Sequence, residues 1–452
     1  MIETTSVVGD NRDKKKQKGV CRMESRIEEI RKEHGMSQDE LAEKLSVSRQ
    51  TVSEWERGIT YPSVAKLVMI SNLFGVSLDY IVNGKVYDGK DKNETSFLKF
   101  SSKLNARGYV VGKKNGMVAS IPETEFVGNT LVCGRPGSGK STTYLVPNIL
   151  NAIKRKETVV SVALDEELLP TIEKQAIDSG YRVIKLDFTN LIGPRQKIDL
   201  VDEVFDKNGK PSYDLIKLLY RNIVHKEDYL VFALFVNMVS NHVKLKNIAD
   251  MDVPHVFGSP NFTEDYIRSH TNDEIKNAFM GLKFHLNALN SDANDLVSEK
   301  SVTLSDMCQE KTITFINPVF TDPYIRKLTS SIINMLLFKI STKQIMIEGK
   351  MNLFIDMFGT IEEQNELLKY TYVLPKNISM SVLVQSIRQL RCSHVVSENA
   401  FENLIFMDID SSTIDSDIIT KVTGIDVSKK TTSNDIIYKR RSIPPYILQK
   451  YN

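Results

Sequence analysis

Cysteine is scarce in this sequence of 452 residues, and none of the four cysteines is spaced from another as zinc ligands or disulfide partners would be. This scarcity indicates a reducing compartment. The net charge is only +2, so any surface that binds nucleic acid must be a local patch. The longest apolar run, 230–239, is about half of the roughly 20 residues that a membrane-spanning helix needs. With no signal peptide visible either, we expect a cytoplasmic protein without a membrane span.

What the sequence does contain is a glycine-rich segment that follows a run of apolar residues. It matches the phosphate-loop pattern G-x-x-x-x-G-K-[ST], in which backbone N–H groups and a helix N-terminus face phosphate oxygens. In this pattern Lys140 reaches the β- and γ-phosphates and Ser141 binds Mg²⁺. The pattern therefore predicts ATP and Mg²⁺ as cofactors; a glycine loop with a chance lysine is the alternative. The predicted nucleotide-binding residues are Gly134, Arg135, Pro136, Gly137, Ser138, Gly139, Lys140, Ser141 and Thr142.

Strand-like and helix-like segments alternate after this loop. Short apolar runs typical of buried strands lie at 159–163, 183–186, 313–316, 353–356, 381–384 and 404–406, with amphipathic stretches between them. Such alternation predicts a mostly parallel sheet with helices on both faces. We expect an α/β fold of the RecA-like P-loop class. A polar helical stretch at 262–304 breaks the alternation, which predicts a small all-helical insert.

A different pattern precedes this region. Helix signals recur in quick succession from residue 24, including a capping box at Ser37 and Glu40 and a second helix N-cap at Ser48. Two short helices joined by a tight turn, with other helices around them, predict an all-α helix-turn-helix domain. We expect a disordered tail at 1–23, this domain at 24–83, a linker at 84–107 and the P-loop domain at 108–452.

The segment 36–58 closely resembles the phage Cro/repressor-type (xenobiotic response element) DNA-binding family. This resemblance implies that Gln38 holds a phosphate, while Ser48, Arg49, Gln50 and Ser53 face the major groove of DNA. Gln and Arg suit the reading of base edges because each can form two hydrogen bonds in one plane. The charges of the segment nearly balance, so docking to a protein partner stays open as an alternative.

An ATPase also needs a carboxylate at the end of a strand beside the loop to hold Mg²⁺. Asp356, after the apolar run 353–355, meets this need. Segments 353–359 and 384–390, with 134–150, resemble the acidic motif, the glutamine motif and the phosphate loop of the type IV coupling proteins. Those are P-loop ATPases that deliver DNA to conjugative type IV secretion machines. By this resemblance the predicted catalytic residues are Lys140, Asp356 and Gln385, with Ser141 and Asp356 on the metal and Gln385 sensing the γ-phosphate; a polar residue that simply ends a strand is the alternative for Gln385.

The chain departs from the coupling proteins in ways that predict weak hydrolysis. Met357 stands where that family has a glutamate next to the aspartate, and Leu374 and Lys376 stand where it has arginines. Loss of an arginine finger alone can cost on the order of 10³ in rate. A carboxylate from Glu362 or Glu363 is the alternative source of water activation.

We therefore expect a coupling-protein-like P-loop protein of a bacterial mobile element, peripheral at a membrane secretion complex. Its expected partners are DNA, further copies of the same chain, and relaxosome or type IV secretion components. A transcriptional regulator that uses a degenerate ATPase domain as a nucleotide sensor or oligomerisation platform is the rival interpretation.

Overall fold

A computed structural model describes residues 24–60, 62–74, 81, 97–102, 107–125, 127–189, 196–224, 227–258, 263–287, 297, 299–319, 321–361, 364–390, 400–408, 415–425, 427, 432, 434–441 and 443–450. The chain divides into two compact units between Thr95 and Ser96.

The N-terminal unit is built from short helices around an apolar core. The Ser37 hydroxyl accepts from the Glu40 amide while the Glu40 carboxylate accepts from the Ser37 amide, so the predicted capping box is present. Ser48 caps the next helix. The helices are α1 (Glu24–Glu33), α2 (Gln38–Leu45), α3 (Arg49–Glu56) and α4 (Val64–Phe74). Their core includes Leu41, Ala42, Leu45, Val52 and Trp55. Within the domain expected at 24–83, residues 61, 75–80, 82 and 83 lie outside the described part of the chain.

The second unit is organised around a sheet of the order β1-β3-β2-β12-β11-β10-β4-β9-β8-β5-β7-β6, which holds 12 strands of the described chain. From β10 to β6 every neighbouring pair is parallel. The remaining pairs are antiparallel. The strands are β1 (Lys99–Ser101), β2 (Tyr109–Lys114), β3 (Met117–Ile121), β4 (Thr130–Gly134), β5 (Thr158–Val162), β6 (Arg182–Asp187), β7 (Thr312–Asn317), β8 (Met351–Ile355), β9 (Ile378–Val384), β10 (Asn403–Met407), β11 (Asp435–Arg440) and β12 (Ile443–Gln449). The predicted α/β fold with a mostly parallel sheet is confirmed.

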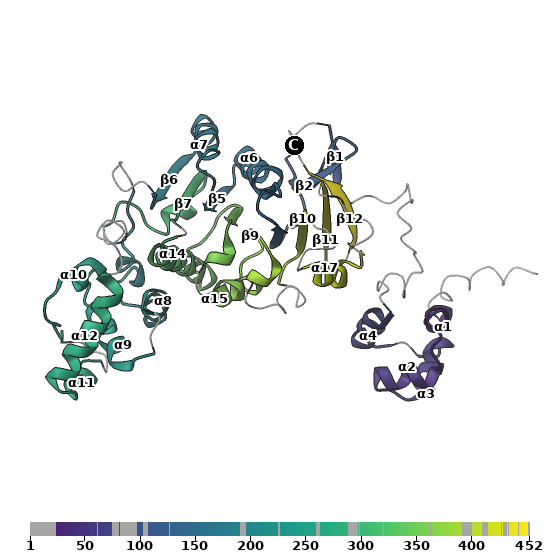
Figure 1. Ribbon diagram of the computed structural model, residues 1–452, viewed down its shortest axis with the longest axis horizontal. Coiled ribbons are helices and arrows are strands. Elements are labelled where there is room, and N and C mark those ends of the chain that lie inside the picture. The colour runs from purple at the N-terminus through teal and green to yellow at the C-terminus, as the bar shows by residue number, and fades with distance from the viewer. Residues whose placement is uncertain are drawn as a thin grey trace, which may run out of the picture. The chain divides into compact units, whose positions relative to one another are not determined.

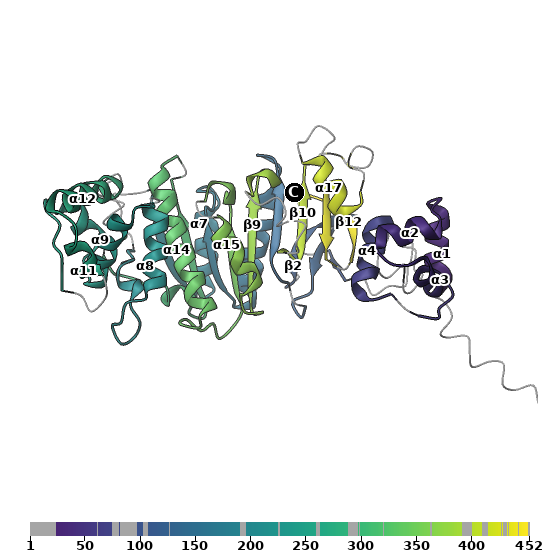
Figure 2. The ribbon, with the colours of Figure 1, turned by 90° about the horizontal axis from the view of Figure 1, so that it is seen from below.

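Helices cover both faces of this sheet (Figures 1 and 2). On one face, α6 (Val146–Arg155) and α7 (Leu169–Asp178) pack on one buried apolar cluster. On the other, α14 (Pro323–Ser341), α15 (Gln364–Lys369) and α17 (Ser416–Thr423) pack on a second. Apart from the edge strand β6, the parallel strands are almost wholly buried, and most of their residues are apolar.

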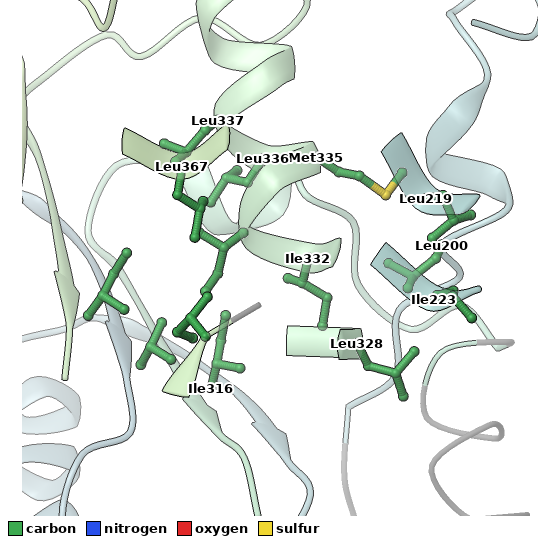
Figure 3. Close-up of a cluster of buried hydrophobic side chains, with 14 of the residues drawn as sticks. Leu200, Leu219, Ile223, Ile316, Leu328, Ile332, Met335, Leu336, Leu337 and Leu367 are labelled. Carbon is green, nitrogen blue, oxygen red and sulfur yellow. The ribbon is translucent and has the colours of Figure 1, made fainter. Parts of the chain in front are cut away.

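Between β6 and β7 the chain forms helices that gather beyond the β6 and β7 end of the sheet (Figures 1 and 2). They are α8 (Tyr213–Ile223), α9 (Tyr229–Ser240), α10 (Leu245–Asp250), α11 (Thr263–Arg268) and α12 (Asn272–Asn287). The helical region thus begins at Tyr213, well before residue 262. Its helices α8 and α9 bury apolar side chains in the same cluster as α12 and α14. In Figure 3, Leu328 and Ile332 of α14 lie with Ile316 of β7 and with Leu219 and Ile223 of α8.

The longest apolar run of the sequence is the buried helix α9. Among the described residues, no helix combines the length and apolarity needed to cross a bilayer.

Candidate nucleotide site and DNA-binding helix

The glycine-rich loop leaves the carboxyl end of β4 and needs its glycines for two different reasons. A Cβ on Gly134 would lie 2.7 Å from the Met407 carbonyl oxygen and 2.6 Å from the Ser138 hydroxyl, so only glycine allows this close approach. Gly137 and Gly139 have φ values of +74° and +86°, where side chains are strained. A π-helical turn, Ser141–Leu145, then leads into α6.

The backbone of the loop is arranged as an anion cradle. The amides of Gly137, Gly139 and Lys140 donate no hydrogen bond to any described residue. The Ser138 hydroxyl is buried and likewise has no partner in the described part of the chain. Clustered hydrogen-bond donors that lack acceptors within the protein are suited to bind a ligand with several oxygen acceptors. These features fit the phosphates of a nucleotide.

Lys140 lies inside this cradle. Its ammonium donates to the carbonyl oxygens of Gly134 at 2.7 Å and Arg135 at 3.2 Å. Burial lowers the pKa of Lys140, and the nearby Asp356 carboxylate opposes that shift. The ammonium is thus partly removed from water, and both of its acceptors are neutral carbonyls. An anionic phosphate would compensate its charge far better.

Asp356 follows β8, two strands away from β4, at the same edge of the sheet. The Ser141 hydroxyl donates to its carboxylate at 3.5 Å, and the Met357 amide donates at 2.7 Å. Burial raises the pKa of Asp356, and the charge of Asp165 after β5 adds to that rise. Parallel strands bring their carboxyl ends together, which is why residues 134–141 and 356 meet here.

The oxygens of Ser141 and Asp356 suit Mg²⁺, which takes one or two protein oxygens together with phosphate and water. No group of three or more His, Cys, Asp or Glu side chains that could hold a metal by itself exists among the described residues. The donor set therefore fits a metal bound jointly with a nucleotide.

Gln385 comes directly after β9, the strand between β4 and β8. Its side-chain amide donates to the Met357 sulfur at 3.5 Å, and its backbone amide donates to the Gln389 side chain at 2.8 Å. Met357 has a left-handed conformation with φ of 52°. Lys140, Asp356 and Gln385 thus come from three adjacent strands. Glu362 and Glu363 lie outside the described residues.

The remaining loop residues are more exposed. Arg135 makes an ion pair with Asp408 after β10, at 3.1 Å, and Pro136 is exposed. Thr142 is exposed too, and its hydroxyl donates to the Gly139 carbonyl oxygen at 3.3 Å.

Two residues near the site belong to no motif of the sequence. A Cβ on Gly139 would lie 3.8 Å from Cδ of Lys450, which follows β12. The Asp415 carboxylate, at the start of α17, accepts from the Ser386 hydroxyl at 3.0 Å and the Ile387 amide at 2.8 Å. Only the tertiary fold brings these C-terminal residues to the nucleotide site, so local sequence patterns hold no signal for them.

The predicted DNA-contacting side chains lie at the start of α2 and along α3. Ser48, Arg49 and Gln50 are exposed. Arg49 lies 3.7 Å from the Asp39 carboxylate, and Gln50 donates to Glu54 at 3.1 Å. Both interactions are exposed at the surface and therefore weak, so contacts with DNA can replace them.

The other two residues predicted to contact DNA are held more firmly within the domain. Gln38 donates to the Glu56 carboxylate at 2.7 Å, and Glu56 is also paired with Arg31. Ser53 is partly buried, and its carbonyl oxygen accepts from the Arg57 guanidinium at 3.1 Å.

Comparison with known proteins follows the same division of the chain. A family model described as type IV secretory system conjugative DNA transfer matches residues 81–331, more than half of the sequence. This chain belongs to that family. The match ends inside α14, so Asp356 and Gln385 of this conjugative DNA transfer family member lie beyond it. A helix-turn-helix model matches residues 27–81. Both predicted resemblances are confirmed.

The fold of this family member is similar to that of the bacterial conjugative coupling protein TrwB. The unbound TrwB structure has a TM-score of 0.55 at 14% sequence identity and covers 77% of this chain and 89% of its own. At that identity the likeness establishes the fold alone.

The helix-turn-helix part has curated relatives. The transcriptional regulator ImmR of Bacillus subtilis is 39% identical over 77 residues, or 16% of this chain and 56% of ImmR. The transcriptional activator BcrR of Enterococcus faecalis is 37% identical over 60 residues, 13% of this chain and 29% of BcrR. The chain thus spans less than two thirds of either regulator, and the similarity lies in the DNA-binding module.

Proposed function

We propose that this protein binds a nucleoside triphosphate with Mg²⁺ at the carboxyl edge of its parallel sheet. One observation carries the proposal: the Ser141 hydroxyl of the phosphate loop lies 3.5 Å from the Asp356 carboxylate, across two strands. A structure of TrwB in complex with ADP and Mg²⁺ has a similar fold, with a TM-score of 0.51 and 14% identity. That complex supports the same ligand here.

Each residue has a distinct task in this site. The loop amides and Lys140 hold the phosphates. Ser141 and Asp356 hold the metal, which supplies Lewis-acid stabilisation of the phosphoryl group. Gln385, directly after the strand between β4 and β8, would contact the γ-phosphate.

We further propose that hydrolysis is slow or absent. Met357 places a thioether, which cannot accept a proton from water, directly after Asp356, and its sulfur holds the amide of Gln385. Leu374 and Lys376 stand where an arginine would stabilise transition-state charge.

The deciding experiment measures ATP affinity and ATP turnover on the same purified chain, with and without single-stranded DNA. We expect micromolar-range binding with little turnover. Met357→Glu should raise turnover, with Met357→Leu as the matched control that removes the sulfur without adding a carboxylate. Turnover at motor rates in the unaltered protein would refute the slow-hydrolysis proposal, and no binding would refute the nucleotide site.

For the whole chain we propose a coupling-protein-like role, in which the helix-turn-helix unit binds DNA of a mobile element and the P-loop unit engages a type IV secretion system. Copies of the chain are proposed to assemble with one another, and relaxosome or secretion components are the proposed partners. Residues Gln38, Ser48, Arg49, Gln50 and Ser53 would contact the DNA.

One observation favours a rival: the curated relatives of residues within the N-terminal unit are transcriptional regulators. Footprinting on the upstream region of the gene, with and without ATP, separates the two roles. A sharp operator favours the regulator. Salt-sensitive binding without sequence preference, retained when the helix-turn-helix unit carries Arg49→Ala and Gln50→Ala, favours the coupling role.

A further inference from the structure

Asp415 fixes the backbone that follows Gln385. Its two carboxylate oxygens accept hydrogen bonds from the Ser386 hydroxyl at 3.0 Å and from the Ile387 amide at 2.8 Å. The Cys133 thiol on β4 donates to the same carboxylate at 3.7 Å. Asp415 is only 6% exposed, so these contacts are shielded from water. A buried carboxylate that accepts from a backbone amide is among the stronger hydrogen-bonding arrangements.

Two further contacts hold the same turn. The Gln389 side chain accepts from the Gln385 amide at 2.8 Å. A Cβ on Gly359 would lie 2.6 Å from the Gln389 side chain, so Gly359 leaves the room that Gln389 needs. The turn 385–390 is therefore held by Asp415 from outside the turn and by its own Gln389 side chain, which packs closely against Gly359. The side-chain amide of Gln385 donates to the sulfur of Met357, the residue that follows Asp356.

We infer that Asp415 is a positioning residue for the nucleotide site, one that presents the Gln385 side chain to the γ-phosphate. This rests on the proposed function, because Gln385 is the residue proposed to contact that phosphate. Asp415 begins α17, so the same contacts link the nucleotide edge to the helix after β10. The Cys133 thiol stays neutral, since burial and the Asp415 charge raise its pKa, and it can keep donating to the carboxylate.

The test compares ATP with ADP, because only ATP carries the phosphate that Gln385 would contact. Affinities of both nucleotides are measured by calorimetry on the full chain for Asp415→Asn and Ser386→Ala. Asp417→Asn is the matched control: it removes the same charge from an exposed position in the first turn of the same helix. We expect Asp415→Asn to reduce the preference for ATP over ADP about 10-fold, as the loss of one hydrogen bond to a charged group would. Ser386→Ala should reduce it less, and Asp417→Asn should leave it unchanged.

A purely structural role for Asp415 would weaken ATP and ADP equally, and that result would overturn the inference. Gln385→Ala supplies the second test. If Asp415 acts through Gln385, Asp415→Asn added to Gln385→Ala lowers the ATP preference no further, whereas additive losses contradict the inference. Should Asp415→Asn fail to fold, Ser386→Ala answers the same question. Failure of the unaltered chain to bind either nucleotide refutes the proposed function itself, while binding of both with no change in the variants refutes only the role of Asp415.

Discussion

Buried charges lie at both ends of the parallel strands, and the two groups are compensated very differently. At the amino end, the Glu157 carboxylate accepts from Arg155 at 2.8 Å, from Asn352 at 2.8 Å and from the Tyr109 hydroxyl at 3.2 Å. The Arg155 guanidinium also lies 4.0 Å from the centre of the Tyr109 ring. Burial opposes the charge of Arg155, yet its hydrogen bond to Glu157 and the nearby Tyr109 raise its pKa. Most charged and polar groups of this cluster thus find their partners within the cluster itself.

At the carboxyl end, burial dominates instead. It lowers the pKa of Lys140 and raises that of Asp356, so each shift disfavours the charged form. The internal partners of these two side chains do not outweigh the loss of water. Titratable groups shifted in this direction beside a loop of unpaired amides are typical of a ligand site, whereas a buried ion pair such as Arg155 with Glu157 is typical of a structural one.

The largest effect should come from the amino end. Glu157→Ala leaves Arg155 buried without its carboxylate, which should lower the free energy of unfolding by about 3–5 kcal/mol. Urea unfolding followed by circular dichroism measures the change. Trp55, the single tryptophan, lies in the N-terminal unit, so its fluorescence transition should stay in place and serves as an internal control.

Exposed Glu167 provides the matched substitution, and Glu167→Ala should change stability by less than about 0.5 kcal/mol. If Glu157→Ala cost no more than this control, the amino-end cluster would not be the structural counterpart of the nucleotide site.

These two ends differ in how far sequence patterns can reveal them. The loop residues, Asp356 and Gln385 lie at strand ends within recognisable local motifs, and the alternation of apolar runs predicts the parallel sheet that brings them together. Glu157 carries no motif, because its partners come from separate elements that meet only in the tertiary fold. Asp415 contacts Cys133 across 282 positions of sequence, which no local pattern encodes.

The antiparallel strands β11 and β12 show a second limit of sequence patterns. Pro444 and Pro445 argue against a strand, because proline cannot donate to a ladder. In the structure they fall where the pairing register of β11 and β12 shifts, between Tyr438 and Arg440. There β12 tolerates residues without an amide hydrogen.

The second-largest effect should appear at the carboxyl end, and in binding rather than in stability. Lys140→Ala removes an ammonium from the cradle and should weaken ATP binding about 10- to 100-fold, the range for hydrogen bonds to charged groups. Stability should change little, since the lost bonds to two carbonyls are offset by relief of the buried charge. Calorimetric titration measures the ATP affinity, and thermal unfolding measures the stability. Lys174→Ala, at an exposed position on α7, should change neither, and a large stability loss from Lys140→Ala alone would contradict the contrast.

A smaller effect, opposite in sign, is expected at Asp356. Its raised pKa means that the folded protein holds this proton more tightly than the unfolded chain, whose ordinary value is 3.8. Stability is therefore lost as pH rises from about that value through the raised pKa. Asp356→Asn should remove this loss and stabilise the nucleotide-free protein at pH 7 by about 0.5–2 kcal/mol, while Mg²⁺ no longer strengthens ATP binding. Thermal unfolding at pH 4 and pH 7 measures the stabilisation, which should be smaller at pH 4. If Asp356→Asn instead destabilised the protein at pH 7, the charge of the Asp356 carboxylate would be fully compensated by partners within the fold.

The smallest effect should come from the ion pair between Arg135 and Asp408, which belongs to the nucleotide loop but is exposed to water. The Arg135 side chain is 48% exposed and that of Asp408 16% exposed, so solvent screens their attraction at 3.1 Å. Arg135→Ala should change the free energy of unfolding by less than about 1 kcal/mol, the usual range for exposed pairs. Any effect should diminish in high salt. Urea unfolding at low and high salt measures it, with ATP affinity recorded alongside. A several-fold loss of ATP affinity that persists in high salt would place Arg135 with Lys140 among the groups that contact the ligand, because salt screens a short, shielded contact less than an exposed ion pair.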